Sequence, residues 1–121
     1  METFFNGLLL NNVSANVFPS QAPDSIEQSW KEFIVYDCAG IMDMDAYGRG
    51  TVLLYIYVPP MGASDKKNVA HFSNIEQKLD AAINNNKDAT YHIERRGTYT
   101  DYDEQKKMFV NIIEINLVIL T

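Results

Sequence analysis

The stretch Thr51-Val-Leu-Leu-Tyr-Ile-Tyr-Val58, followed directly by Pro59-Pro60, decides the fold of this chain. β-Branched, aromatic and aliphatic residues fill it, and such residues fit the pleated, half-buried surface of a sheet. Neither proline can donate a hydrogen bond to a neighbouring strand, so strand pairing is expected to end there. The stretch therefore predicts a central β-strand with an abrupt end.

An amphipathic helix is predicted after this strand, from Asn68 to Asn84. Gly62-Ala-Ser-Asp65 supplies a loop and a helix start, and the asparagines from Asn84 onward supply a stop. Apolar residues recur between these points at helical spacing, namely Val69, Phe72, Ile75, Leu79 and Ile83. One apolar stripe of this kind needs a sheet to pack against.

Three further strands and a second helix are expected from hydrophobic periodicity. The alternation of side chains predicts strands at 31–38 and 89–96, and a nearly continuous apolar run predicts a long strand at 108–120. Residues 2–11 predict a short N-terminal helix, and 11–29 predict a long connection. The glycine-containing segment 40–50 predicts a hairpin loop or irregular strand end, and the polar segment 97–107 predicts a projecting loop.

These elements predict one α+β domain over residues 1–121, in the order α-β-β-α-β-β. The expected architecture is a mostly antiparallel four-stranded sheet, with the main helix and the short N-terminal helix packed on it. The helix could also join 51–58 and 89–96 as parallel neighbours, and the sequence leaves the strand order open. The strand at 108–120 is longer than a small sheet needs, so we expect its ends to overhang, with an edge that is either covered or used to join another chain.

Composition indicates a globular protein that needs no disulfide bond or structural metal. Of the 121 residues, 46% are hydrophobic and 21% are charged, and no apolar run is long enough to cross a bilayer. Cys38 is the only cysteine, which excludes an intrachain disulfide and a cysteine zinc site. No secretory signal is expected at the N-terminus, so a reducing compartment is the simplest assumption. The net charge of −6 opposes general binding to nucleic acid.

The sequence contains no complete metal-binding or catalytic motif. Asp43-Met-Asp-Ala-Tyr-Gly48 begins like a calcium loop, but its fifth and twelfth positions are Tyr47 and Leu54, which excludes an EF-hand and leaves only a weak surface calcium site. The two histidines, His71 and His92, lack the spacing of a metal-binding helix. Cys38 lies on a predicted strand without a group that would activate its thiol. The sequence therefore predicts no enzyme, no catalytic residue, no cofactor and no metal.

Three segments taken together resemble a known family of structural proteins. They are the proline-containing link Val17-Phe-Pro-Ser-Gln-Ala-Pro23, the strand Glu32 to Asp37, and Met42-Asp-Met-Asp-Ala-Tyr-Gly48 leading into Thr51 to Val58. With the helix and the final pair of strands, they resemble bacteriophage tail-terminator or tail-completion (head-tail joining) proteins and their prophage homologues. The resemblance covers nearly the whole chain, but it rests on element order and not on a catalytic motif.

The resemblance implies a non-enzymatic role in virion assembly. Such proteins form homo-oligomers, commonly hexameric rings, on the end of the tail tube, where they stop its polymerisation and form the joint to the head. Tail-tube and head-connector proteins are the implied partners, without sequence-specific nucleic acid or a membrane. The implied location is the cytoplasm of the bacterial host, and the virion in an active phage.

Contacts with neighbouring subunits or partners are then expected in the two polar segments, 43–50 and 97–107. The candidate contact residues are Asp43, Asp45, Tyr47, Arg49, Tyr99, Tyr102 and Asp103. The alternative hypothesis is a small accessory or ligand-binding α+β domain in which Trp30, Tyr36, Tyr55 and Tyr57 line a concave pocket. The two hypotheses differ in solution, because the first predicts an oligomer and the second a stable monomer.

Overall fold

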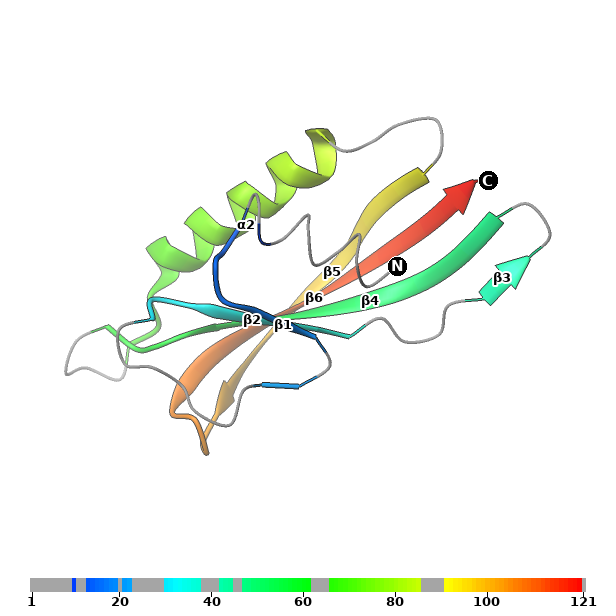
Figure 1. The fold of residues 1–121 in the computed structure, drawn as a ribbon. Helices are drawn as coiled ribbons and strands as arrows, with labels where there is room; N and C mark the ends of the chain where they lie inside the picture. Colours follow the sequence, from blue (N-terminus) through cyan, green and yellow to red (C-terminus); the bar gives the residue numbers. More distant parts are fainter. Residues whose placement is uncertain are drawn as a thin grey trace.

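The protein forms a twisted sheet with a long helix lying across one of its faces (Figure 1). The computed structural model describes residues 10, 13–19, 21–22, 30–37, 42–44, 47–61, 66–85 and 91–120. Within these ranges the strands are β1 (Val17–Pro19), β2 (Phe33–Asp37), β3 (Met42–Met44), β4 (Tyr47–Val58), β5 (Tyr91–Asp103) and β6 (Met108–Leu120), and the helix is α2 (Val69–Asn85). No helix in the described part of the chain is long and apolar enough to cross a membrane.

The six strands form one mixed sheet in the order β1-β2-β4-β6-β5, with β3 paired to β4 outside this path. β1 runs parallel to β2, and the other pairs are antiparallel. Since β4 and β5 are both antiparallel to β6, they run parallel to each other with β6 between them. The segment β4-α2-β5 is therefore a split β-α-β unit, and the predicted possibility that 51–58 and 89–96 are direct neighbours is wrong.

The prediction of a four-stranded antiparallel sheet with two helices is also wrong. Val17–Pro19 lies in the predicted connection, yet it forms a fifth position in the sheet path through parallel pairing with β2. Such a strand has little sequence signal, because it is three residues long and ends in a proline, which is tolerated at a sheet edge. Of the predicted N-terminal helix only Leu10 is described, and it is helical; the remainder lies outside the described residues.

Strands reach into two segments, of which 97–107 was predicted as a projecting loop and 40–50 as a hairpin loop or irregular strand end. β5 continues through Gly97 as far as Asp103, because a bulge between Arg95 and Gly97 absorbs one residue without ending the pairing with β6. β4 begins at Tyr47, where it forms a hairpin with β3. The predicted overhang of 108–120 is wrong, since β6 pairs with β4 over Phe109–Leu120 and with β5 over Met108–Ile119.

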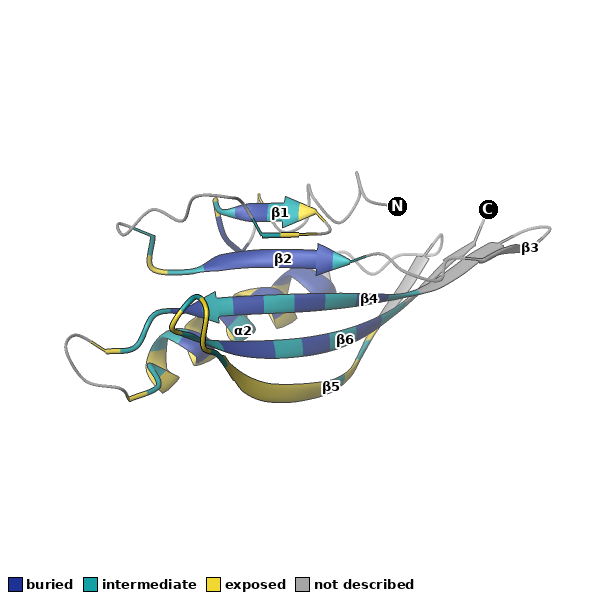
Figure 2. Ribbon diagram, turned by 90° about the horizontal axis from the view of Figure 1, so that it is seen from below, coloured by how far each residue is buried: buried dark blue, intermediate teal, exposed yellow. Residues whose placement is uncertain are grey.

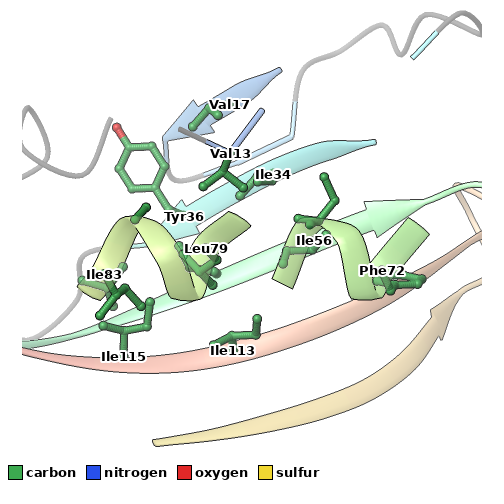
Figure 3. Packing of buried hydrophobic residues seen from close by; sticks show 14 of the residues in the cluster. Val13, Val17, Ile34, Tyr36, Ile56, Phe72, Leu79, Ile83, Ile113 and Ile115 are labelled. Atoms are coloured by element: carbon green, nitrogen blue, oxygen red, sulfur yellow. The ribbon is translucent and has the colours of Figure 1, made fainter. Parts of the chain in front are cut away.

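The hydrophobic core lies between α2 and the sheet (Figure 3). From α2, Phe72, Leu79 and Ile83 point toward Ile56 of β4 and toward residues of β2 and β6. Val13 and Val17 close the core on the β1 side. Four residues of the predicted stripe, Phe72, Ile75, Leu79 and Ile83, are buried, because residues at that spacing share one helical face. The prediction is wrong for Val69, which begins the helix and is 62% exposed.

Shortening one core residue tests this arrangement. The variant Leu79→Ala should lower the free energy of unfolding by about 2–5 kcal/mol, because Leu79 is fully buried and the truncation leaves a cavity. Urea denaturation followed by circular dichroism measures the change. As a control, Gln77→Ala on the exposed side of α2 should change stability by less than about 0.5 kcal/mol. Equal effects of the two variants would contradict the placement of the helix.

The turn between β5 and β6 spans residues 104–107 and is tightened by one side chain. The Asp103 Oδ1 atom accepts a hydrogen bond from the Lys106 backbone N–H at 3.0 Å. Lys107 then closes the turn with φ at 54°, in the left-handed region that side chains with a Cβ adopt at a cost. The loop predicted from polar composition at 97–107 is thus reduced to the turn at 104–107.

Glycine at the closing position should stabilise the hairpin. Lys107→Gly removes the left-handed penalty of a Cβ but adds chain entropy to the unfolded state, so we expect a net gain of about 0.5 kcal/mol. Thermal unfolding measures it. The matched control is Glu104→Gly in the same turn, where φ is not positive and only the entropic loss remains, so stability should fall.

Candidate functional site

One face of the sheet carries α2, and the opposite face, called here the open face, is viewed directly in Figure 2. Because side chains alternate along each strand, the neighbours of the core residues lie on this face. Its apolar members in the central strands are Leu53, Tyr55, Tyr57, Val110 and Ile112. Val110 is buried, and the other four are half-buried. The open face therefore carries an apolar patch on its central strands, bordered by Thr51, Glu114 and Asn116, and no described helix covers it.

Aromatic rings cover one corner of the open face, near β1 and β2. Phe33 is only 1% exposed and stacks on the Tyr57 ring with centroids 4.6 Å apart. The rings of Trp30 and Phe18 pack beside Phe33, at 6.3 and 6.4 Å. Trp30 thus fills an aromatic cluster with Phe18 and Phe33.

The β5–β6 turn folds over the other side of Tyr57. Lys106 places its Nζ atom 5.4 Å from the centre of the Tyr57 ring and 3.2 Å from the Asp103 carboxylate. Burial raises the pKa of Tyr57, and the charge of Asp103 adds to this effect. The pKa of Asp103 is lowered by the backbone hydrogen bond from Lys106, with help from the lysine side chain. These contacts anchor the turn to the open face.

The lowered pKa of Asp103 predicts a pH dependence of stability. A carboxyl group whose folded pKa is depressed stabilises the fold above its unfolded pKa, near 4, and this contribution is lost as the pH falls through the folded pKa. Asp103→Asn should therefore lower stability at pH 7 by about 0.5 kcal/mol, the scale of an exposed ion pair. The difference between the two proteins should shrink when unfolding is measured at about pH 3. The same difference at both pH values would contradict the charge contribution.

A chain of polar side chains links α2 to β5 and β6 on the helix-covered face. Asn111 is 4% exposed; its Oδ1 atom accepts hydrogen bonds from Lys67 Nζ at 2.9 Å and Thr100 Oγ1 at 3.0 Å, and its Nδ2 atom donates to Glu76 at 3.0 Å. Glu76 also pairs with the guanidinium group of Arg95. Asn111, the buried member of this series of polar side chains, has hydrogen-bond partners for its amide oxygen and its amide nitrogen. We therefore interpret the series as a structural link between helix and sheet.

The predicted contact residues of β5 do not lie on one surface. Tyr99 faces the same side as Ile112 and is 62% exposed, so it extends the open face. Tyr102 is 38% exposed and points to the opposite side, where it meets the Phe109 ring edge-on at 4.9 Å. Asp103 faces the open side again and is held in the turn. Tyr99 is therefore the residue of the three that is most available to a partner.

The predicted contact residues of the first segment lie at the far end of the sheet. Asp43 is opposite Gly48 in the β3–β4 hairpin, and Arg49 is opposite Met42. Tyr47 pairs with Leu120, whereas Asp103 pairs with Met108 at the other end of β6. The distance between these ends is roughly 40 Å at the usual rise per residue. Asp45 lies outside the described residues. The two predicted segments therefore form two separate surfaces.

The aromatic pocket of the alternative hypothesis does not form from its four residues. Tyr36 is 2% exposed and belongs to the core under α2, whereas Tyr55 and Tyr57 lie on the open face. Trp30 packs on Phe18 and Phe33. The alternation of strand side chains separates these residues, because Tyr36 pairs with Leu54 and not with either tyrosine.

A pair of titratable side chains was not predicted as a site. His71 Nε2 lies 3.2 Å from the Glu32 carboxylate, which joins the first turn of α2 to the start of β2. A pocket of about 390 Å³ opens beside this pair. No group of three potential metal ligands occurs within the described ranges. The two residues are 39 positions apart, and no local motif in the sequence marks such a pair.

Comparison with known proteins gives no relative to guide the assignment: no family model matches the chain, and no curated protein matches it. By its geometry the protein is an α+β domain with an apolar patch on the open face of its sheet and a pocket lined by residues of the β2, β4 and α2 ends.

Proposed function

We propose that this protein is a non-enzymatic structural subunit of a phage or prophage, of the tail-terminator kind. It assembles with copies of itself as a ring at the end of the tail tube, stops tube polymerisation and joins the head. It does so in the cytoplasm of the bacterial host and remains in the virion of an active phage. The proposal starts from the sequence resemblance, and the open face is the structural observation that supports it.

The open face has the properties of a contact surface. Tyr99 exposes most of its side chain next to half-buried Tyr55 and Ile112, across three adjacent strands. A contiguous apolar patch of this kind on a folded domain usually marks an interaction site. β5 ends the sheet beside this patch, and no described residue pairs with its outer edge. A neighbouring subunit can therefore use both side-chain and backbone contacts here.

The separation of the two predicted contact segments favours a ring over a simple dimer. The β3–β4 hairpin and the β5–β6 turn lie at opposite ends of the sheet. When one end of a subunit meets the other end of the next, the contact is head-to-tail, and repeated head-to-tail contacts close into a ring if the rotation permits. The net charge of −6 is compatible with a ring through which DNA slides without being gripped.

The oligomeric state in solution tests the proposal. Multi-angle light scattering after size exclusion, over a range of concentrations and with the tail-tube protein of the same phage or prophage, should detect an oligomer or a complex. Tyr99→Asp should weaken assembly at least tenfold in concentration, because a carboxylate would be buried in the contact.

The matched control is Val69→Asp on α2, since Val69 has the same exposed fraction of 62% but lies away from the open face. It should assemble like the original protein. A monomer under every condition, with or without tail-tube protein, would overturn the proposal and favour the accessory-domain alternative.

A further inference from the structure

The pocket beside the His71–Glu32 pair forms where three segments of the chain meet. Its walls are Lys31 before β2, the segment Val58–Met61 at the end of β4, and Asn68 and His71 at the start of α2. Pro59 and Pro60 end the pairing of β4, so the backbone leaves the sheet between β2 and the helix. The two prolines that end β4 thus also form part of the wall of this pocket of about 390 Å³.

The polar side chains in this pocket favour an anion. Lys31 lines the pocket and forms no salt bridge with any described residue, and no carboxylate is among the lining residues. Glu32 is nearby, but its carboxylate is held by His71 Nε2 at 3.2 Å. A pocket lined only by neutral and basic side chains contrasts with the net charge of −6 of the whole chain. Lys31 therefore supplies a positive charge at the pocket that is available to an anionic group, while His71 holds the Glu32 carboxylate.

The remaining wall is apolar and rigid. Val58 is buried, the two proline rings are half-buried, and Met61 is 52% exposed at the rim. The backbone of Met61 is held, because its N–H donates a hydrogen bond to the carbonyl of Lys66 at 3.0 Å. Proline rings add apolar surface without rotamers to order, and methionine adapts to irregular shapes. The anion that fits such a site carries a short apolar group beside its charge.

We propose that this pocket binds a carboxylate attached to a short aliphatic group, with Lys31 facing the charge and the Val58–Met61 wall facing the aliphatic part. The carboxylate can belong to a free acid or to the C-terminal residue of a polypeptide. The proposal does not depend on ring assembly, because the residues that line the pocket are not those assigned to the subunit contact.

Nuclear magnetic resonance titration with ¹⁵N-labelled full-length protein tests the proposal. N-acetyl-leucine should shift the amide signals of Met61, Asn68 and His71 in a saturable manner, whereas N-acetyl-leucinamide, which has no charge, should not. A peptide of several residues that ends in leucine should bind more tightly than N-acetyl-leucine if the source is a chain terminus, and equally if it is a free acid. Both results support the carboxylate site and distinguish its source.

Substitution of Lys31 tests the assigned role of its charge. Lys31→Gln should weaken binding of N-acetyl-leucine at least threefold, and because Lys31 is exposed the fold should be unaffected. The control Lys78→Gln changes net charge equally but lies on the exposed side of α2, outside the pocket. Equal shifts with the uncharged amide, equal binding by inorganic phosphate, equal loss in both variants, or no saturable shift would each overturn the proposal.

Discussion

Pairing of β6 on both of its edges is the constraint on which the rest of the structure depends. β4 and β5 each bond to it along twelve or thirteen residues, so the two must lie parallel and one strand apart. The chain bridges this distance through α2, whose apolar stripe then lies over β4 and β6 and forms the core. Each later feature, from the polar link at Asn111 to the open face, follows from where these three strands place their alternating side chains.

Much of the helix and of the strand ends could be predicted from local sequence. The helix was expected at 68–84 and lies at Val69–Asn85, the final strand lies at Met108–Leu120 as expected, and β4 ends at Val58 before the prolines. The helix and the final strand were predictable from strong hydrophobic periodicity, and the end of β4 from two prolines, which have no backbone N–H to donate. β1 and the strand order could not be predicted, because a three-residue parallel strand is specified by its partner β2 and not by its own residues. Likewise, Gly97 predicts the end of a strand from local sequence. In the structure the strand continues past it, because pairing with β6 resumes after a bulge between Arg95 and Gly97.

The candidate surfaces were predicted less completely than the fold. Tyr99 is exposed on the open face, whereas Tyr102 faces the other side of the sheet because an odd number of positions separates the two in one strand. A segment predicted as a loop gives no information about which side chains share a face, because side chains alternate between two faces only within a strand. The pocket was missed because Lys31, Pro60 and His71 are distant in sequence and carry no shared motif. The double proline predicts the end of the strand, but it carries no information about which segments meet beside it.

The bulge in β5 influences how the outer edge of the sheet behaves in concentrated solution. A foreign strand can extend a sheet only where consecutive backbone groups lie in one register. The extra residue between Arg95 and Gly97 shifts that register and increases the local twist, so the edge presents two short runs instead of thirteen residues in line. Uncontrolled edge-to-edge aggregation into fibrils is thereby opposed. Any strand that does dock must match one of the two runs, which makes the edge selective for the length and curvature of what it accepts.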